Sequence, residues 1–382
     1  MKKILRRTGL VLLLAFILFN AWVVLSGKSY FYKALLYNFA DIDDYKIFPE
    51  RKIGKSAKPQ PWPKSTHYNQ TDISDTLRKN LVALESVALL IIKNDSLVYE
   101  EYWDGYGENS FSNSFSMAKS YVSTLVGAAL QEGKIKSIDQ PIGYFLPEFK
   151  EGDKQKITIR HLLMMSSGLN WVEGYSSPFS PTTEAYYGTD LKKLMSGLKP
   201  IEEPGKIFRY KSGDTQILSF VLEQATGKAL SDYAHEKLWE PLGCENDALW
   251  SLDKKDGYEK AYCCVNSNAR DFARLGKLYL DSGKWNGQIL IPQEYVLASI
   301  RPNHLPDGDL DMKPSEFYGY QWWTIPQYQG HDIFYARGIL GQYIIVIPDQ
   351  RKIVVRLGKQ RGPSVGKHYK EALLLIDEAL AR

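Results

Sequence analysis

Hydrophobic positions recur with two different periods along this chain, and each period predicts one kind of element. Residues 9–25 are almost purely apolar, which predicts an N-terminal helix near the shortest length that spans a bilayer. Apolar residues at helical spacing predict a buried helix that ends near Gly133; they are Ala118, Val122, Leu125, Val126, Ala129 and Leu130. Shorter helices are expected over 74–84, within 206–227, over 269–283 and over 368–380.

Short apolar runs bounded by turn residues predict strands near both ends of the chain. Residues 86–92 and 96–99 flank Asn94-Asp95 and predict a β-hairpin. Three later strands are expected over 333–336, 342–347 and 352–357. The region between, about 139–250, is rich in helix. We therefore expect an α+β fold: one antiparallel sheet flanked by N- and C-terminal helices, with a large all-helical lobe inserted.

The chain divides into three parts by composition. Residues 1–27 form a membrane anchor or signal segment, residues 28–70 an extended connector rich in Tyr and then in Pro and Lys, and residues 71–382 the globular domain. Four basic residues precede the apolar run, so this flank should stay in the cytoplasm and the rest outside. A cleaved signal peptide is the alternative, but no small-x-small cleavage site follows the run, which favours an uncleaved anchor.

Composition excludes several classes of protein. Among 382 residues, 44% are hydrophobic and 24% charged, as in ordinary globular proteins. The net charge is +4, and no long basic run predicts a nucleic-acid partner. The six histidines are scattered without metal-ligand spacing, and no Gly-x-Ser-x-Gly elbow or phosphate loop is present. We expect no metal and no cofactor.

Three cysteines do not indicate a disulfide framework. Cys263 and Cys264 are neighbours, which disulfide geometry disfavours as a pair. Cys244 has the option of pairing with either one, and buried free thiols are the favoured interpretation.

Ser116 and Lys119 stand at the start of the predicted buried helix and are the first candidates for chemistry. Their spacing of one helical turn places both side chains on one face. A serine hydroxyl attacks when a base removes its proton, and a lysine is that base only where burial favours its neutral amine. The free N–H groups at the helix start favour negative charge nearby. A helix-cap serine beside a solvated lysine is the alternative that this spacing leaves open.

Such a hydrolase also needs a proton shuttle and an oxyanion site. Tyr210 would serve as the shuttle if it lies near the lysine, although alone it is equally one of 25 tyrosines available for packing. Gly338 and Gly341 would let a backbone approach a ligand, with a plain hairpin turn as the alternative. The same Ser-x-x-Lys spacing also occurs, without a long apolar helix, at Ser196/Lys199, Ser251/Lys254 and Ser364/Lys367.

Four segments together make the chain resemble the serine β-lactamase-like superfamily. Ser116-Met117-Ala118-Lys119 matches the Ser-x-x-Lys motif, and Phe208-Arg209-Tyr210-Lys211-Ser212 matches the Tyr-x-Asn/Ser motif. Residues 159–169 and 268–276 look like two further segments of this group. The similarity covers about residues 75–380. Within the superfamily the chain resembles the class C-related branch, and most of all its 6-aminohexanoate-dimer-hydrolase-like and esterase-like members. The resemblance implies a β-lactamase/transpeptidase-like fold.

The resemblance also implies a role for each motif residue. Ser116 would be the acylated nucleophile, and Lys119 and Tyr210 would share the general acid/base work. Ser212 would help to orient Lys119 or the substrate. The backbone N–H groups of Ser116 and Ile339 would form the oxyanion site.

The third motif departs from the β-lactamase pattern. Ala336-Arg337-Gly338 falls where the family has Lys-Thr-Gly or His-x-Gly, so the lysine that commonly meets the carboxylate of penicillins is absent. Arg337 is the candidate replacement for that charge. The departure argues against β-lactams and favours amide or ester substrates. Tyr175, Tyr186 and Tyr187, in the loop after Trp171, are weaker candidates for the pocket wall.

The sequence therefore predicts a serine hydrolase that acts on a small molecule or short peptide through an acyl-enzyme. Its expected place is the bacterial inner membrane, held by one N-terminal anchor with the catalytic domain outside the cytoplasm, or the periplasm after signal cleavage. A peptidoglycan-directed D-amino-acid peptidase or carboxypeptidase, or a β-lactamase, on the same scaffold is one alternative. A non-catalytic binding module is the other, and the intact Ser116, Lys119 and Tyr210 argue against it.

Overall fold

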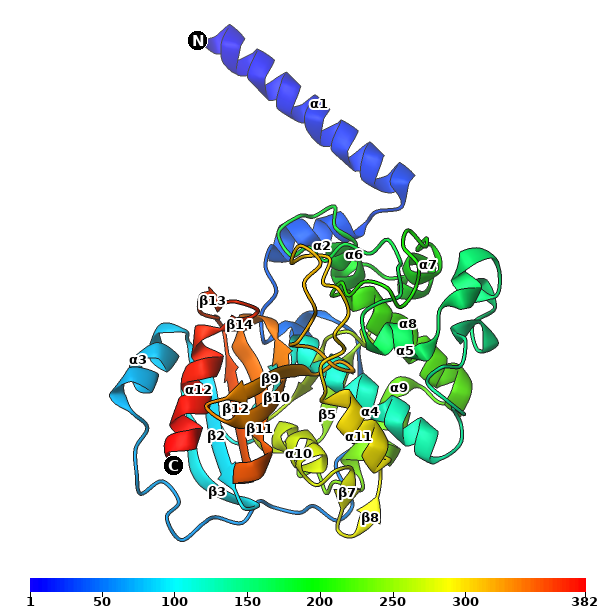
Figure 1. Cartoon of the computed structure of the whole chain (residues 1–382). Coiled ribbons are helices and arrows are strands. Elements are labelled where there is room, and N and C mark those ends of the chain that lie inside the picture. The colour runs from blue at the N-terminus through cyan, green and yellow to red at the C-terminus, as the bar shows by residue number, and fades with distance from the viewer.

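The computed structural model describes all 382 residues, and a six-stranded antiparallel sheet forms its centre (Figure 1). The strand order is β3-β2-β12-β11-β10-β9. The strands are β2 (Ser86–Lys93), β3 (Ser96–Tyr102), β9 (Trp323–Tyr328), β10 (His331–Gly338), β11 (Gln342–Ile347) and β12 (Lys352–Gly358). Early and late strands thus share one sheet, which confirms the predicted α+β fold. Strand β9 was not predicted because Pro326 interrupts it, and proline is tolerated there because β9 is an edge strand.

Apolar cores cover both faces of the sheet. Helices α3 (Asp75–Ala83) and α12 (Lys370–Ala381) pack on one face, and α10 (Ala269–Leu280) packs on the other (Figure 1). Along β11 the side chains alternate between the two cores: Tyr343 and Ile345 join one, Ile344 and Val346 the other. This two-sided burial explains why β11 is apolar without interruption.

The helical lobe lies beside the sheet and is built around two packed helices, α4 (Ala118–Gln131) and α8 (Ser212–Thr226). Gly133 follows α4 with a φ of 70°, as the predicted stop requires. The other helices of this region are α5 (Ile159–Leu163), α6 (Pro181–Tyr187), α7 (Leu191–Ser196) and α9 (Leu230–Ala234), and α11 (Gln293–Ser299) follows later in the chain.

Several short strands were not predicted. A second sheet has the order β1-β5-β6-β4, with β1 (Glu50–Ile53), β4 (Ser112–Asn113), β5 (Ala248–Ser251) and β6 (Val265–Ser267). Two small hairpins pair β7 (Lys284–Trp285) with β8 (Gln288–Ile289) and β13 (Ser364–Val365) with β14 (His368–Tyr369). These strands have two to four residues, too few to show a period in the sequence.

Residues 28–70 differ from the expected extended connector, because they fold onto the domain. Helix α2 (Tyr30–Tyr37) packs beside α6, and β1 pairs with β5. Apolar side chains hold this segment in place: Phe31 is 3% exposed, and Ile42 and Ile53 are fully buried. Burial of these side chains stabilises the packed arrangement over a free tether.

Helix α1 (Lys2–Ser26) projects away from the body on the side of α2 (Figure 1). It is long and apolar enough to cross a membrane, and only 6% of its most apolar window is buried. Asn20 does not leave its amide unpaired, since it donates to the Phe16 carbonyl and accepts from the Tyr32 hydroxyl, both at 2.8 Å. The helix is consistent with either a signal sequence or a single anchor.

The expectation of free thiols at the neighbouring cysteines was wrong. Cys263 and Cys264 form a disulfide across adjacent residues, with their Cα atoms 3.7 Å apart. The chain turns sharply between them, since Cys264 has a φ of 74°. Cys244 is free and buried, as predicted.

Candidate active site

Ser116 lies in a short turn, η2 (Phe115–Met117), directly before α4. Phe115 has a φ of 43°, which is uncommon for a residue with a side chain, and its N–H donates to the Asn113 side chain at 2.9 Å. The turn presents Ser116 partly exposed, while Lys119 on the first turn of α4 is 1% exposed. The predicted proximity of the two side chains is confirmed: Lys119 Nζ is 2.9 Å from Ser116 Oγ.

The surroundings of Lys119 favour its neutral form. Burial lowers the pKa of Lys119 to about 7, and the nearby Glu173 carboxylate opposes this shift. The Nζ atom also donates to the Tyr262 carbonyl at 2.8 Å, which fixes the amine beside the serine. At neutral pH a large share of Lys119 is therefore uncharged and able to accept a proton from Ser116.

Tyr210 stands just before α8, on a segment that the loop after α5 holds in place. The Arg209 N–H donates to the Met165 carbonyl at 2.9 Å, and the Lys211 N–H contacts Met165 Sδ at 3.3 Å. The Lys211 amine donates to the Leu169 carbonyl at 2.6 Å. The segment 159–169 thus positions Tyr210 rather than contributing a reactive group.

The Tyr210 phenol is close to Lys119 and stays protonated. Lys119 Nζ lies 5.1 Å from the centre of the Tyr210 ring. Burial and the Glu173 carboxylate raise the pKa of Tyr210, while the Ser116 hydroxyl and the Arg337 guanidinium act in the opposite direction. Since the pKa is raised, the phenol keeps its proton at neutral pH and is poorly suited to be the resting base.

Glu173 was not predicted from the sequence, and it lies at the centre of a hydrogen-bond cluster beside the site. One carboxylate oxygen accepts from Ser212 Oγ and from the Tyr175 hydroxyl, both at 2.7 Å. The other accepts from the Ser212 N–H at 2.8 Å and from Trp171 Nε1 at 2.7 Å. Glu173 therefore connects the loop after Trp171 to the start of α8. A single acid in an irregular loop has no spacing signal, so only the folded chain shows this role.

The end of β10 passes directly against the turn that carries Ser116. A Cβ on Gly338 would lie 2.2 Å from the Ser114 carbonyl oxygen, so only glycine fits there. Ile339 and Leu340, which follow, line the same cavity as Ser116. Arg337 does not line it: its guanidinium stacks 3.3 Å from the centre of the Trp323 ring and donates to the Lys367 carbonyl at 2.7 Å.

Ser116 opens into a cavity of about 400 Å³. Tyr175, Tyr186 and Tyr187 lie in its wall, and so does Ser212. Two parts of the wall were not expected, namely Cys263 of the disulfide and residues of α2 with the segment that follows it. Arg361 is the one charged residue in the wall.

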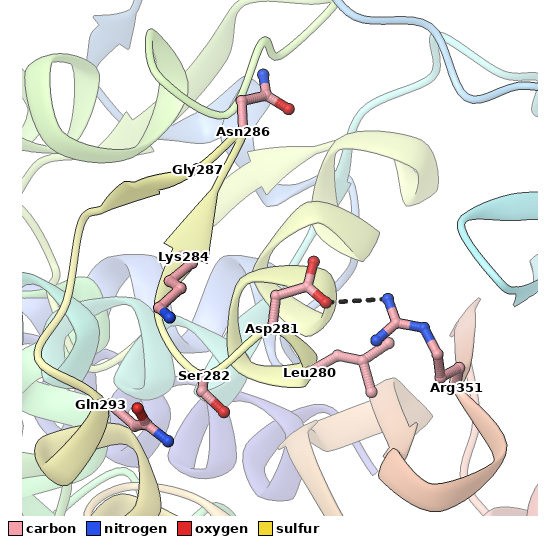
Figure 2. Close-up of a pocket in the computed structure, with 8 residues that line it drawn as sticks. All are labelled: Leu280, Asp281, Ser282, Lys284, Asn286, Gly287, Gln293 and Arg351. Carbon is pink, nitrogen blue, oxygen red and sulfur yellow. Dashed lines mark hydrogen bonds and ion pairs between the residues drawn. The ribbon is translucent and has the colours of Figure 1, made fainter.

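A second hollow lies at the end of α10, next to β7 and β8 (Figure 2). These elements are far from α2 (Figure 1). It contains none of the residues that surround Ser116. Its Asp281 and Arg351 form an ion pair at 2.9 Å (Figure 2). No three His, Cys, Asp or Glu side chains converge anywhere in the chain in a way that could hold a metal ion.

Comparison with solved structures defines the class of the fold. A Bacillus anthracis protein assigned as a 6-aminohexanoate-dimer hydrolase aligns with a TM-score of 0.75 and 22% identity, over 89% of this chain and 91% of its own. A family VIII carboxylesterase aligns with a TM-score of 0.64 and 17% identity, over 84% of this chain and 99% of its own. The chain therefore has the β-lactamase/transpeptidase-like fold that was predicted.

The chain belongs to the Beta-lactamase family, whose model matches residues 75–377. Among characterised relatives, the 6-aminohexanoate-dimer hydrolase of Paenarthrobacter ureafaciens is 27% identical over 314 residues, or 77% of this chain and 78% of the relative. This confirms the predicted resemblance, and the protein is a hydrolase of the β-lactamase family.

Proposed function

We propose that this protein is an exported serine hydrolase that cleaves an amide or ester bond through an acyl-enzyme on Ser116. The observation that carries the proposal is the contact of 2.9 Å between Ser116 Oγ and the buried Lys119 amine. A neutral lysine at this distance is the base that the serine hydroxyl needs.

The reaction begins when Ser116 Oγ attacks the substrate carbonyl carbon and its proton passes to the neutral Lys119 amine. The oxyanion that forms is stabilised by the backbone N–H groups of Ser116 and Ile339. The carbonyl then re-forms, the C–N or C–O bond breaks, and the leaving group takes a proton through the Tyr210 phenol. Water then attacks the acyl-enzyme with the proton transfers reversed, which releases the acid and restores Ser116. Ser212, fixed by Glu173, lines the cavity with Ser116 and is placed to orient the substrate.

The substrate class follows from the cavity wall. Ala336 is fully buried and Arg337 is occupied by Trp323 and the Lys367 carbonyl, so the third motif offers no free cation for the carboxylate of a penicillin. The relative from Paenarthrobacter ureafaciens is named for hydrolysis of an amide dimer, which supports amides as substrates here. Small amides and esters are therefore proposed ahead of β-lactams, whose carboxylate would have to meet Arg361, the one cation of the wall, in place of the third motif.

Export is proposed on two features. The basic residues in the first two turns of α1 favour a cytoplasmic N-terminus, and the Cys263–Cys264 disulfide suits an oxidising compartment. We propose residues 1–27 as an uncleaved anchor and residues 71–382 as the hydrolase domain. Alkaline phosphatase fused after Arg382 should be active in cells, and the same fusion without residues 1–27 inactive. An inactive full-length fusion contradicts export.

The test of the nucleophile is intact-mass analysis of the full chain in detergent after reaction with a fluorophosphonate. We expect a single adduct on the wild type and none on Ser116→Ala. Ser196→Ala is the matched control, because Ser196 and Lys199 have the same spacing outside the site. An unlabelled, folded wild type, or a labelled Ser116→Ala, contradicts the proposal. A panel of short amides, esters and β-lactams then ranks the substrates by kcat/KM.

A further inference from the structure

The end of α1 is packed onto the wall of the Ser116 cavity and is not a free tether. Val23 is 1% exposed. The Trp22 ring lies 4.9 Å from that of Phe31 on α2 and 6.2 Å from that of Phe179, and the rings of Phe31 and Phe179 are 5.1 Å apart. Tyr32 of α2 donates to Asn20 of α1. If α1 spans a bilayer, these contacts hold α2 and the loop around Phe179 at the surface of that bilayer.

This region exposes apolar side chains that the fold leaves uncovered. We call Leu35, Leu36, Phe39 and Phe179 the apolar rim; they are 62%, 74%, 72% and 66% exposed. Tyr30, Phe31 and Ala34 are buried on the inner side of α2, so the helix is apolar on both sides. Such a helix suits the boundary between protein and lipid rather than open water.

The composition next to the rim also suits a lipid surface. Trp22, Tyr32 and Tyr37 are exposed around the end of α1, and Trp and Tyr concentrate at membrane interfaces. Residues 28–40 contain two lysines and no acidic residue; Lys28 pairs with Glu184 at 3.6 Å, which leaves Lys33 as the cation favourable beside anionic headgroups.

The apolar rim continues into the cavity. Leu35 and Phe39 line the same cavity as Ser116, together with Ala34, Asn38 and Ala40. One short segment therefore forms both the surface at the end of α1 and one wall of the reaction site. A molecule held in the lipid leaflet beside α1 would meet the mouth of the cavity without first dissolving in water.

We propose that the apolar rim rests on the lipid bilayer and that the natural substrate is an amphiphile anchored in that leaflet, whose amide or ester reaches Ser116 past α2. This inference rests on the proposed hydrolase function. The chemistry is unchanged: the C–N or C–O bond of the amphiphile breaks, the acyl group passes to Ser116 and then to water, and the leaving amine or alcohol takes the proton.

The contact with lipid is tested by fluorescence quenching on the full chain in liposomes. Leu36→Cys is labelled with an environment-sensitive dye, since Cys244 is buried and the other two cysteines are paired. Val82→Cys on α3 is the matched control, an apolar helix residue that is 62% exposed and remote from α1. Brominated lipids should quench the dye at position 36 and leave it unchanged at position 82. Equal quenching at both positions, or none at 36, contradicts the inference.

The consequence for catalysis is tested with two esters that share one acyl group. One is the soluble 7-acetoxycoumarin, and the other is the same ester bearing a dialkylglycerol tail that holds it in the liposome. Leu36→Glu, which is outside the cavity wall, should keep kcat/KM for the soluble ester and lower it roughly tenfold for the anchored ester, since a carboxylate replaces a lipid contact. Val82→Glu should keep both values.

The outcomes separate the two proposals. If neither ester is hydrolysed and the fluorophosphonate does not react, the hydrolase function itself is contradicted. If the soluble ester is hydrolysed but Leu36→Glu leaves the anchored ester unaffected, only the present inference is contradicted. A Leu36→Glu variant that turns a dimer into a monomer in sedimentation, without lipid quenching at position 36, identifies a second copy of the chain as the occupant and also overturns it.

Discussion

Among the buried lysines of this protein, two have a pKa lowered to about 7, and only one of these two has a reactive neighbour. Lys119 at the start of α4 and Lys260 between β5 and β6 are 1% and 0% exposed. Burial lowers the pKa of each to about 7. Yet Lys119 Nζ contacts the Ser116 hydroxyl, whereas Lys260 Nζ donates to the Ala185 carbonyl at 3.2 Å and lies 4.7 Å from the centre of the Phe48 ring.

The comparison teaches that a neutral amine is not by itself a site. Desolvation produces a lysine able to accept a proton in both regions, and a perturbed pKa alone would identify both as catalytic. The difference lies in two features of the Lys119 region. The Ser116 hydroxyl is 2.9 Å from Lys119 Nζ, and the end of β10 at Gly338 passes against the turn that carries Ser116. Lys260 has neither, so we interpret its burial as structural.

The largest effect that separates the two regions is expected from removing each amine. Lys119→Met should lower kcat/KM for a soluble ester by about a thousandfold or more, because Ser116 loses its base. Lys260→Met should keep it within about threefold, since no proton transfer passes through that amine. The measurement is steady-state hydrolysis with the rate of fluorophosphonate labelling. If both variants are folded by their melting curves and lose kcat/KM equally, Lys119 and Lys260 cannot be distinguished as a catalytic and a structural lysine.

The second effect concerns the end of β10 at Gly338, which lies beside Ser116 in the Lys119 region and has no counterpart beside Lys260. Gly338→Ala places a Cβ 2.2 Å from the Ser114 carbonyl oxygen, so β10 must move away from the turn that carries Ser116. We expect kcat/KM to fall by about a hundredfold or more, the usual cost of a lost oxyanion donor. Gly107→Ala, where no atom lies within 4 Å of the added carbon, is the control and should keep full activity. Full activity of Gly338→Ala would show that the close approach does not matter.

What the sequence could predict of these regions was local. The neighbouring positions of Ser116 and Lys119 follow from helix geometry, and the hairpin at Asn94-Asp95 follows from turn residues that adopt positive φ, here 49° and 61°. The helix over 269–283 was likewise predicted; the structure adds its cap, since Asn268 accepts from the Asp271 N–H.

What the sequence could not predict depends on contacts between distant segments. Glu173 binds Ser212 across 39 residues, and no period or motif links the two. The role of residues 28–40 in the cavity wall required the fold of α6 and the end of β10. The disulfide between Cys263 and Cys264 required a backbone turn at Cys264 that its residue type does not indicate.

The third effect concerns Lys260 and is measured as the pH dependence of the free energy of unfolding. The pKa of Lys260 is about 7 in the folded protein and near 10.5 in an unfolded chain. The unfolded state therefore binds more protons between these values, and the folded state gains stability as pH rises through that window. Lys260→Met lacks this group. The free energy of unfolding of the wild type, relative to that of the variant, should therefore rise by up to about 1.4 kcal/mol per pH unit between pH 8 and 9.5.

Urea unfolding at several pH values measures this difference, and Lys119 is present in both proteins, so its own contribution cancels. Lys79→Met, which removes an exposed lysine of α3, is the control and should show a curve parallel to the wild type. If the free energy of unfolding of the wild type does not rise relative to that of Lys260→Met above pH 8, the Lys260 amine is charged in the folded state.

The smallest effect is expected in the pKa of Lys119 and is measured as the midpoint of the pH dependence of activity. The pKa of Lys119 reflects burial, which lowers it, against the Glu173 carboxylate, which raises it. Activity should rise with pH as Lys119 loses its proton, with a midpoint near the pKa of about 7. Glu173→Gln removes the negative charge, so the pKa of Lys119 falls and the midpoint of kcat/KM moves to lower pH, by less than about one unit.

The direction of this shift separates electrostatics from packing. Glu173→Gln also disturbs the bonds to Ser212, which lowers the plateau of the profile, but a loss of packing alone would leave the midpoint in place. Glu203→Gln, which removes a carboxylate with a 68% exposed side chain, should leave both midpoint and plateau unchanged. If the midpoint of kcat/KM against pH is the same in Glu173→Gln as in the wild type, burial alone sets the pKa of Lys119.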